Sequence, residues 1–156
     1  MKLNSVLTLL FIALFTACKG GAYDLSGYGL KPDTGENASP LIAKALQEIA
    51  AEVNFDTVRI LLPKGRYDFY PEGASKREYF ISNHDQDNPK LVGLAFENMK
   101  NVIFDGQGSE LVFHGRMLPV SLVGSENCTL KNFSIDFANP HISQVKVLEN
   151  DTVGGL

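Results

Sequence analysis

The chain has 156 residues, with 14 lysines and arginines against 18 aspartates and glutamates and a formal net charge of −4. A slightly acidic chain without a stripe of basic residues has little to neutralise phosphates, so we expect no nucleic acid among its partners. Its two cysteines exclude a disulfide framework, and cysteine and histidine do not have the spacing of a zinc site.

The N-terminus has the pattern of an export signal. Lys2 is a short basic region, Val6–Phe15 is an apolar segment too short to span a membrane, and small residues precede Cys18. This pattern resembles a bacterial lipoprotein signal, in which residues 1–17 are removed and Cys18 is lipidated. We therefore expect an exported protein, attached to the bacterial membrane through Cys18 and facing either the periplasm or the outside. The alternative is an ordinary secretory signal with an incidental cysteine.

Residues 18–22 are expected to form a tether, and residues 23–156 to form one domain. Near its start, Ser39 and Pro40 predict the beginning of a helix, with serine as the N-cap and proline at the first helical position. Apolar residues then follow at helical spacing as far as about Glu52. Such an amphipathic helix, placed before the first strands, would cap the open end of a repetitive β structure.

Short alternating or apolar segments separated by turn residues predict strands along the rest of the chain. They are Thr57–Leu62, Arg66–Tyr70, Glu78–Ser82, Leu91–Phe96, Val102–Phe104, Glu110–Phe113, Pro119–Val123, Cys128–Phe137 and Gln144–Leu148.

A short repeat organises the second half of the chain. The residues from Asn101 recur, 26 positions later, from Asn127, in both cases as alternating apolar residues after an asparagine. Repeats of this length predict a coil that stacks on itself, as in a β-solenoid or parallel β-helix. In this register the inward pairs are Val102 with Cys128, Phe104 with Leu130, and Leu111 with Phe137.

Several longer motifs resemble the N-terminal region of one enzyme family. They are Arg66–Glu72, Glu78–Pro89, Asp105–Gly108, Phe113–Pro119 and Lys131–Phe137. Together they are similar to the bacterial α-1,3-galactosidases of glycoside hydrolase family 110, over nearly all of the chain from Tyr23 to His141.

The resemblance implies an all-β fold, a right-handed parallel β-helix with an N-terminal amphipathic capping helix. It implies an exo-glycosidase that removes terminal α-1,3-linked galactose with inversion, including that of blood group B glycans, without a metal or cofactor. The partners would be galactose-terminated glycans. Family members are longer, so the resemblance makes residues 23–156 the N-terminal part of the domain and places the catalytic carboxylates C-terminal to Leu156.

The residues themselves offer one carboxylate pair in register, Glu110 with Asp136, both at outward positions of the expected sheet. Inverting glycosidases hold their two carboxylates about 6.5–9.5 Å apart, whereas neighbouring strands lie only about 4.8 Å apart. We therefore interpret Asp136 as a candidate for substrate contact, the alternative being a solvated side chain.

Two more groups are candidates for binding sugar. His84, Asp85 and Asp87 lie in a segment dense in hydrogen-bonding groups, which could bind hydroxyls or simply form an Asx-rich turn. A calcium loop is excluded there, because Lys90 stands where the loop needs glycine. His114 and Arg116 follow a strand and could reach a ligand on one face, although such side chains are often only solvated.

Two other functions remain open from the sequence, beside the alternative of a truncated product with no function. One is a different carbohydrate-active β-helix, such as a polygalacturonase-like hydrolase or a lyase. The other is a noncatalytic glycan-binding β-helix, which would bind without turnover.

Overall fold

A computed structural model describes residues 20–52, 57–81, 87–139 and 146. The expected signal, Cys18, His84 and Asp85 lie outside these residues, as does most of the expected strand Gln144–Leu148. The elements in chain order are β1 (Gly20–Asp24), the 3₁₀ helix η1 (Leu25–Tyr28), α1 (Ser39–Ala51), β2 (Thr57–Leu61), β3 (Arg66–Phe69), β4 (Ser75–Arg77), β5 (Lys90–Glu97), β6 (Val102–Phe113), β7 (Leu118–Val123) and β8 (Thr129–Phe137).

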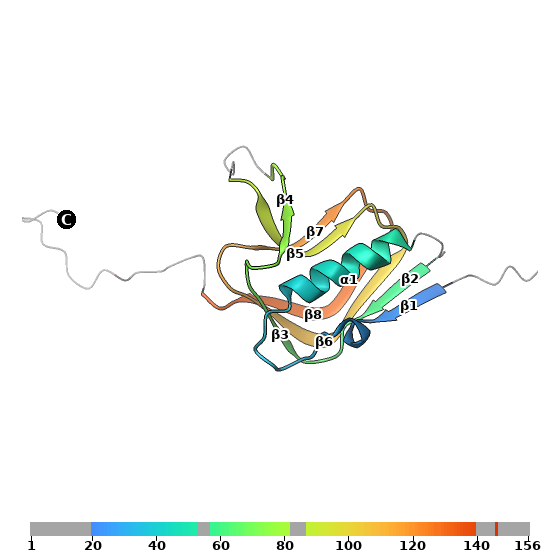
Figure 1. Cartoon of the computed structure of the whole chain (residues 1–156), viewed down its shortest axis with the longest axis horizontal. Helices are drawn as coiled ribbons and strands as arrows, with labels where there is room; N and C mark the ends of the chain where they lie inside the picture. Colours follow the sequence, from blue (N-terminus) through green and yellow to red (C-terminus); the bar gives the residue numbers. More distant parts are fainter. Residues whose placement is uncertain (1–19, 53–56, 82–86, 140–145, 147–156) are drawn as a thin grey trace, which may run out of the picture.

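Five strands form a parallel sheet around β6 (Figure 1). One edge of β6 pairs with β2 over its first residues and with β3 over its last, and β1 pairs with the outer edge of β2. The other edge of β6 pairs with β8. The ends of β3 and β6 therefore lie side by side, which places the residues that follow them close together.

The other three strands form a mixed sheet around β5. β7 runs parallel to β5, whereas the short strand β4 runs antiparallel to it. Apolar side chains from both sheets and from α1 form one core, in which the largest fully buried residues are phenylalanines: Phe69, Phe96, Phe104 and Phe113.

The expected all-β, right-handed parallel β-helix is wrong. The described residues form a helix, a parallel sheet and a separate mixed sheet, and no closed solenoid is found among them. The error arises because the 26-residue spacing between paired strands holds for only part of the structure. Val92 pairs with Leu118, 26 residues away, whereas Val58 pairs with Val102, 44 residues away. The antiparallel strand β4 also has no place in a uniform parallel coil.

The register of the repeat is correct only in part. Phe104 pairs with Leu130 as expected, but Leu111 pairs with Ile135, and Phe137 pairs with Phe113. The cause is an irregularity in β6 between Asp105 and Ser109, which shifts the pairing by two residues. Counting along the sequence cannot reveal such a shift.

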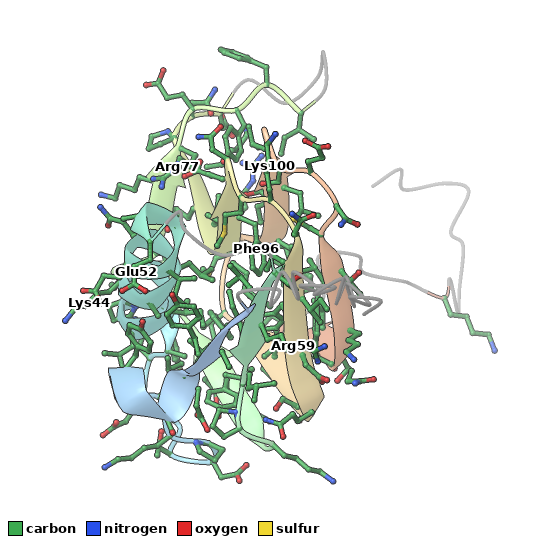
Figure 2. The ribbon with its side chains drawn as sticks, turned by 90° about the vertical axis from the view of Figure 1, so that its right-hand side faces the viewer. Lys44, Glu52, Arg59, Arg77, Phe96 and Lys100 are labelled. Atoms are coloured by element: carbon green, nitrogen blue, oxygen red, sulfur yellow. The ribbon has the colours of Figure 1, made fainter. Side chains whose placement is uncertain are left out.

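The amphipathic helix is present at the expected place. Ser39 is its first residue and not its N-cap, which is Ala38. The Ser39 hydroxyl donates a hydrogen bond to the Tyr70 carbonyl oxygen at 2.7 Å. The apolar face buries Ile42, Leu46 and Ile49 against the core, and burial of such a side chain contributes about 1.5–3 kcal/mol. Figure 2 shows α1 on one side of the strands and β8 on the opposite side.

Two other expectations are corrected. Gly20–Ala22, expected to belong to a tether, are part of β1 and pair with β2. The described part of the expected strand Glu78–Ser82 is not a strand, and the strand there is β4, which ends at Arg77. No helix in the described part of the chain is long and apolar enough to cross a lipid bilayer.

The asparagines that mark the repeat have a structural role. Asn101 and Asn127 both have a positive φ, 55° and 53°, and the Asn127 amide donates a hydrogen bond to Oδ1 of Asn101 at 2.7 Å. Asparagine tolerates the left-handed backbone better than most residues. The two turns before β6 and β8 are therefore stacked and joined through their side chains.

This arrangement predicts different effects for two substitutions of Asn127. Asn127→Ala should lower the free energy of unfolding by about 1–2 kcal/mol, since it loses the hydrogen bond and strains the left-handed backbone. Asn127→Gly relieves the backbone and should cost less. Chemical denaturation of both variants measures the difference, and equal losses would contradict the role of the backbone.

Candidate functional site

The end of β3, the end of β6 and the loop before α1 enclose an open pocket of about 450 Å³. We call it the His114 pocket, and it is lined by Asp33, Gly35, Arg66, Asp68, Tyr70 and His114. Strand alternation brings these side chains together. Tyr67 and Phe69 of β3 are buried in the core, so Arg66, Asp68 and Tyr70 point to the other face.

The loop before α1 is tied to β3 by two hydrogen bonds, one between backbone groups and one from a backbone amide to a side chain. The Asp33 amide donates to the Arg66 carbonyl oxygen at 2.9 Å, and the Arg66 amide donates to Oδ1 of Asp33 at 2.9 Å. The close approach depends on Gly65, where an added Cβ would lie 2.3 Å from Cβ of Pro32. One wall of the pocket is thus fixed by the backbone.

Asp68 is the central group of the pocket. Its carboxylate accepts hydrogen bonds from Nη2 of Arg66 at 2.8 Å and Nε of Arg66 at 3.2 Å. Nε2 of His114 lies 2.8 Å from Oδ1, and the Asp68 side chain is only 7 % exposed. The hydrogen bonds from Arg66, followed by that from His114, hold the pKa of Asp68 below its usual range, although burial opposes them.

The ionised Asp68 also fixes the tautomer of His114. An ionised carboxylate only accepts hydrogen bonds, so Nε2 must carry the proton that joins the two groups. In the neutral imidazole Nδ1 is then an acceptor, and no other described residue forms a hydrogen bond with it. The imidazole is therefore oriented by its carboxylate and keeps one nitrogen available.

Tyr70 and His114 form an aromatic pair across the ends of β3 and β6. Their ring centroids lie 4.1 Å apart and their planes differ by 7°, so the rings are stacked. The His114 amide donates to the Phe69 carbonyl oxygen at 2.8 Å, which continues the pairing of the two strands past their ends. This backbone contact aligns the two rings and makes one polarisable wall of the pocket.

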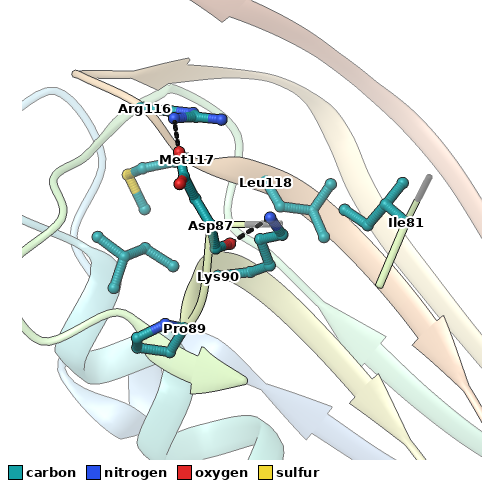
Figure 3. A pocket seen from close by; sticks show the side chains of 8 residues that line it. Ile81, Asp87, Pro89, Lys90, Arg116, Met117 and Leu118 are labelled. Atoms are coloured by element: carbon teal, nitrogen blue, oxygen red, sulfur yellow. Dashed lines mark hydrogen bonds and ion pairs between the residues drawn. The ribbon is translucent and has the colours of Figure 1, made fainter. Parts of the chain in front are cut away.

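A second pocket, of about 350 Å³, lies beside the start of β5 and the start of β7 (Figure 3). We call it the Arg116 pocket. Nη1 of Arg116 lies 2.5 Å from Oδ2 of Asp87, and Nζ of Lys90 donates to the Asp87 carbonyl oxygen. The remaining lining is apolar and includes Met117 and Leu118.

The Arg116–Asp87 pair should matter little for stability. The two side chains are 74 % and 77 % exposed, and exposed ion pairs contribute about 0–1 kcal/mol because water and salt screen them. We expect Arg116→Ala to change the free energy of unfolding by less than about 0.5 kcal/mol, measured by urea denaturation at low salt. A loss above about 1 kcal/mol would mean that the pair is structural.

The structure separates the candidates derived from the sequence. His114 lies in one pocket, whereas Asp87 and Arg116 meet in the other. Asp136 is exposed on β8 and pairs with Val112, so the expected pairing of Glu110 with Asp136 is wrong. The shift of two residues in β6 is again the reason, since it brings Ser134 opposite Glu110.

Sequence reasoning missed the partners of His114. The sequence predicts a strand over Arg66–Tyr70, which contains Arg66, Asp68 and Tyr70, and gives no indication that Asp33 lies beside them. The alternation in the segment Arg66–Tyr70 was a usable signal, because it puts all three on one face. The missing information was the pairing of Phe69 with Phe113, which brings that face to His114. Within residues 20–52, 57–81 and 87–139, no cluster of three or more histidine, cysteine or carboxylate side chains is arranged to hold a metal ion.

Three curated proteins that are similar to this chain share one name. No protein-family model matches the chain. It is 60 % identical over 149 residues to alpha-1,3-galactosidase B of Parabacteroides distasonis, covering 94 % of this chain and 24 % of the relative. It is 58 % identical over 158 residues to an alpha-1,3-galactosidase B of Phocaeicola vulgatus, and this match covers 100 % of this chain and 27 % of the relative. It is 59 % identical over 136 residues to the protein of the same name from Bacteroides fragilis strain NCTC 9343, and this match covers 86 % of this chain and 23 % of the relative.

The chain thus spans about a quarter of the length of the curated relatives it matches, which agrees with the resemblance to an N-terminal portion. The same name recurs at 55 % identity in a second Phocaeicola vulgatus protein. Identities of this size over nearly all of the chain go well beyond a shared turn motif. The chain therefore belongs to the bacterial α-1,3-galactosidases, which are glycoside hydrolases.

Proposed function

We propose that the chain is part of an exo-glycosidase that hydrolyses terminal α-1,3-linked galactose. The observation that carries this proposal is the identity of 55–60 % to proteins named alpha-1,3-galactosidase B. The alternative of a polygalacturonase-like hydrolase or lyase has no comparable support. Galactose-terminated glycans, including blood group B structures, are the proposed substrates.

We further propose inversion at the anomeric carbon, by carboxylates that lie outside the 156 residues. The carboxylate of the His114 pocket supports this placement. A general acid in a glycosidase needs a raised pKa, whereas Arg66 and His114 lower the pKa of Asp68. Asp68 is therefore suited to holding its neighbours in place and not to protonating a leaving group.

The experiment uses a hybrid enzyme. This chain replaces the matching quarter of the Parabacteroides distasonis relative, and release of galactose from an α-1,3-linked galactose disaccharide and from blood group B trisaccharide is measured. We expect turnover of both substrates, with β-galactose as the first product seen by proton NMR. The α-1,6-linked disaccharide is the control.

The outcomes of this experiment are distinct. A hybrid that is folded by circular dichroism but releases no galactose from either α-1,3-linked substrate would contradict the proposed activity. Initial formation of α-galactose would contradict the proposed inversion but not the proposed activity. Turnover of the disaccharide without turnover of the trisaccharide would restrict the substrate class to unbranched glycans.

We also propose that Cys18 is lipidated and anchors the exported protein to the bacterial membrane. The signal-like N-terminus is the support for this proposal. In bacterial cells grown with an alkyne-tagged fatty acid, the protein should be labelled, and Cys18→Ser should abolish the label. Cys128→Ser is the matched control, because Cys128 is half-buried against the core. Equal labelling with serine at position 18 would exclude the anchor.

A further inference from the structure

We infer that the His114 pocket is a binding subsite for a neutral sugar unit, separate from the centre that performs hydrolysis. That the unit is a galactoside rests on the proposed function, whereas its neutral, hydroxyl-rich character rests on the geometry of the pocket.

The first support is the set of hydrogen-bonding groups that remain available. Among the described residues, none forms a hydrogen bond with the Tyr70 hydroxyl, Nδ1 of His114, Nη1 of Arg66 or Oδ2 of Asp33. These groups include donors, acceptors and a hydroxyl that does both. Sugar hydroxyls also donate and accept at once, so the pocket matches the hydrogen-bonding capacity of a pyranose ring.

The second support is that hydrogen bonds within the chain hold the side chains of the pocket in place. The Asp68 carboxylate forms hydrogen bonds with two nitrogens of the Arg66 guanidinium and with Nε2 of the His114 imidazole. The Tyr70 amide donates to Oδ1 of Asn37 and to Oγ of Ser39, both at 3.1 Å. A ligand would therefore have to order few side chains, which lowers the entropic cost of binding.

The third support is the combination of aromatic and polar walls. The stacked rings of Tyr70 and His114 form one wall, and charged or polar groups form the others. The C–H faces of a sugar can pack on an aromatic ring while its hydroxyls reach the polar side. A pocket for an apolar ligand would not need four unengaged polar groups, each of which such a ligand would leave unpaired.

Charge then selects the type of sugar. The positive charge of Arg66 is balanced by Asp68 at 2.8 Å, and Asp33 adds a further carboxylate to the lining. A uronate would bring its own negative charge toward Asp33 without an unpaired cation to meet it. The pocket therefore favours a neutral hexose over galacturonate, the sugar of polygalacturonase substrates.

The first test is titration of the isotopically labelled chain with methyl α-D-galactopyranoside, followed by NMR of the Tyr70 and His114 rings. Saturable shifts of these signals are expected, with weaker shifts for galacturonate at the same concentration. Tyr70→Ala should raise the dissociation constant roughly tenfold, because the aromatic wall is lost. Lys44→Ala, on an exposed part of α1, is the control and should bind as the original chain does.

A second variant keeps the test decisive if Tyr70→Ala does not fold. Tyr70→Phe preserves the stacked pair and removes only the hydroxyl, so it should fold and bind several-fold more weakly. Saturable shifts confined to residues outside the pocket, equal binding of galacturonate, or equal affinities of Tyr70→Phe and Lys44→Ala would each overturn the subsite.

The hybrid enzyme separates this inference from the proposed activity. If the chain binds the galactoside but the hybrid does not hydrolyse, the subsite stands and the proposed activity fails. If the hybrid hydrolyses but the chain shows no saturable shifts at the pocket, the activity stands and the subsite fails.

Discussion

Phe113→Ala is expected to lower the free energy of unfolding by about 3–5 kcal/mol, a large part of the stability of a domain of this size. Phe113 is fully buried, and its ring stacks on Phe69 with centroids 4.7 Å apart. It also packs against Phe137 at 5.9 Å and fills the space above Gly93. Truncation leaves a cavity bounded by strands of both sheets, which cannot collapse without moving backbone. Urea denaturation followed by circular dichroism gives the loss.

Two variants control for this prediction. Phe113→Leu keeps most of the volume and should cost less than half as much, since shape changes in a core cost about 1–1.5 kcal/mol. Phe80→Ala removes the same ring from a position that is 74 % exposed and should change stability by less than about 0.5 kcal/mol. A loss below about 1 kcal/mol for Phe113→Ala would show that the core at this end is not closely packed.

The elements that the sequence predicted correctly are those with a strong local pattern. The apolar stripe of α1 and the apolar runs of β2, β5, β7 and β8 each identify an element without knowledge of its neighbours. β4 was missed, because its three residues contain no large apolar side chain. The segment after it, with Tyr79, Phe80 and Ile81 in succession, has a better strand pattern yet forms no strand in its described part. Ser75–Arg77 forms the strand because it pairs with β5, which a local pattern does not reveal.

The fold could not be predicted in the same way, because it depends on pairings that are distant in sequence. The repeat of 26 residues describes how β5 pairs with β7 and how the first part of β6 pairs with β8. It contains no information about the placement of β1 and β2, or about β3 on the same edge of β6. A uniform coil was inferred from the part of the chain where the spacing is uniform.

The candidate site shows the same limit at the scale of side chains. His114 was identified because it follows a strand, which is a local property. Asp68 is 7 % exposed and lies between an arginine and that histidine, a position that no local pattern reveals. Chemistry-bearing residues were therefore found one at a time, and their combination into a pocket required the register of β3 with β6.

Replacement of Asp68 tests both the structure of the pocket and its behaviour with pH. Asp68→Ala should lower the free energy of unfolding by about 2–3 kcal/mol at neutral pH, because the charged hydrogen bonds are lost. The loss should be smaller than for a fully buried ion pair, since the Arg66 side chain is 48 % exposed and water can solvate it. Asp136→Asn, on the exposed face of β8, is the control and should change stability by less than about 0.5 kcal/mol.

The pH dependence follows from the lowered pKa of Asp68. A carboxylate with a depressed pKa in the folded state stabilises fully above its unfolded pKa of about 3.9, and this stability is lost as pH falls through the folded value. Denaturation midpoints should thus fall for the original chain from about pH 5 downward. Asp68→Asn, which keeps the shape of the side chain but cannot ionise, should reduce this acid-side slope, whereas Asp136→Asn should keep it. An unchanged slope in Asp68→Asn would mean that Arg66 and His114 do not hold the carboxylate in its ionised form.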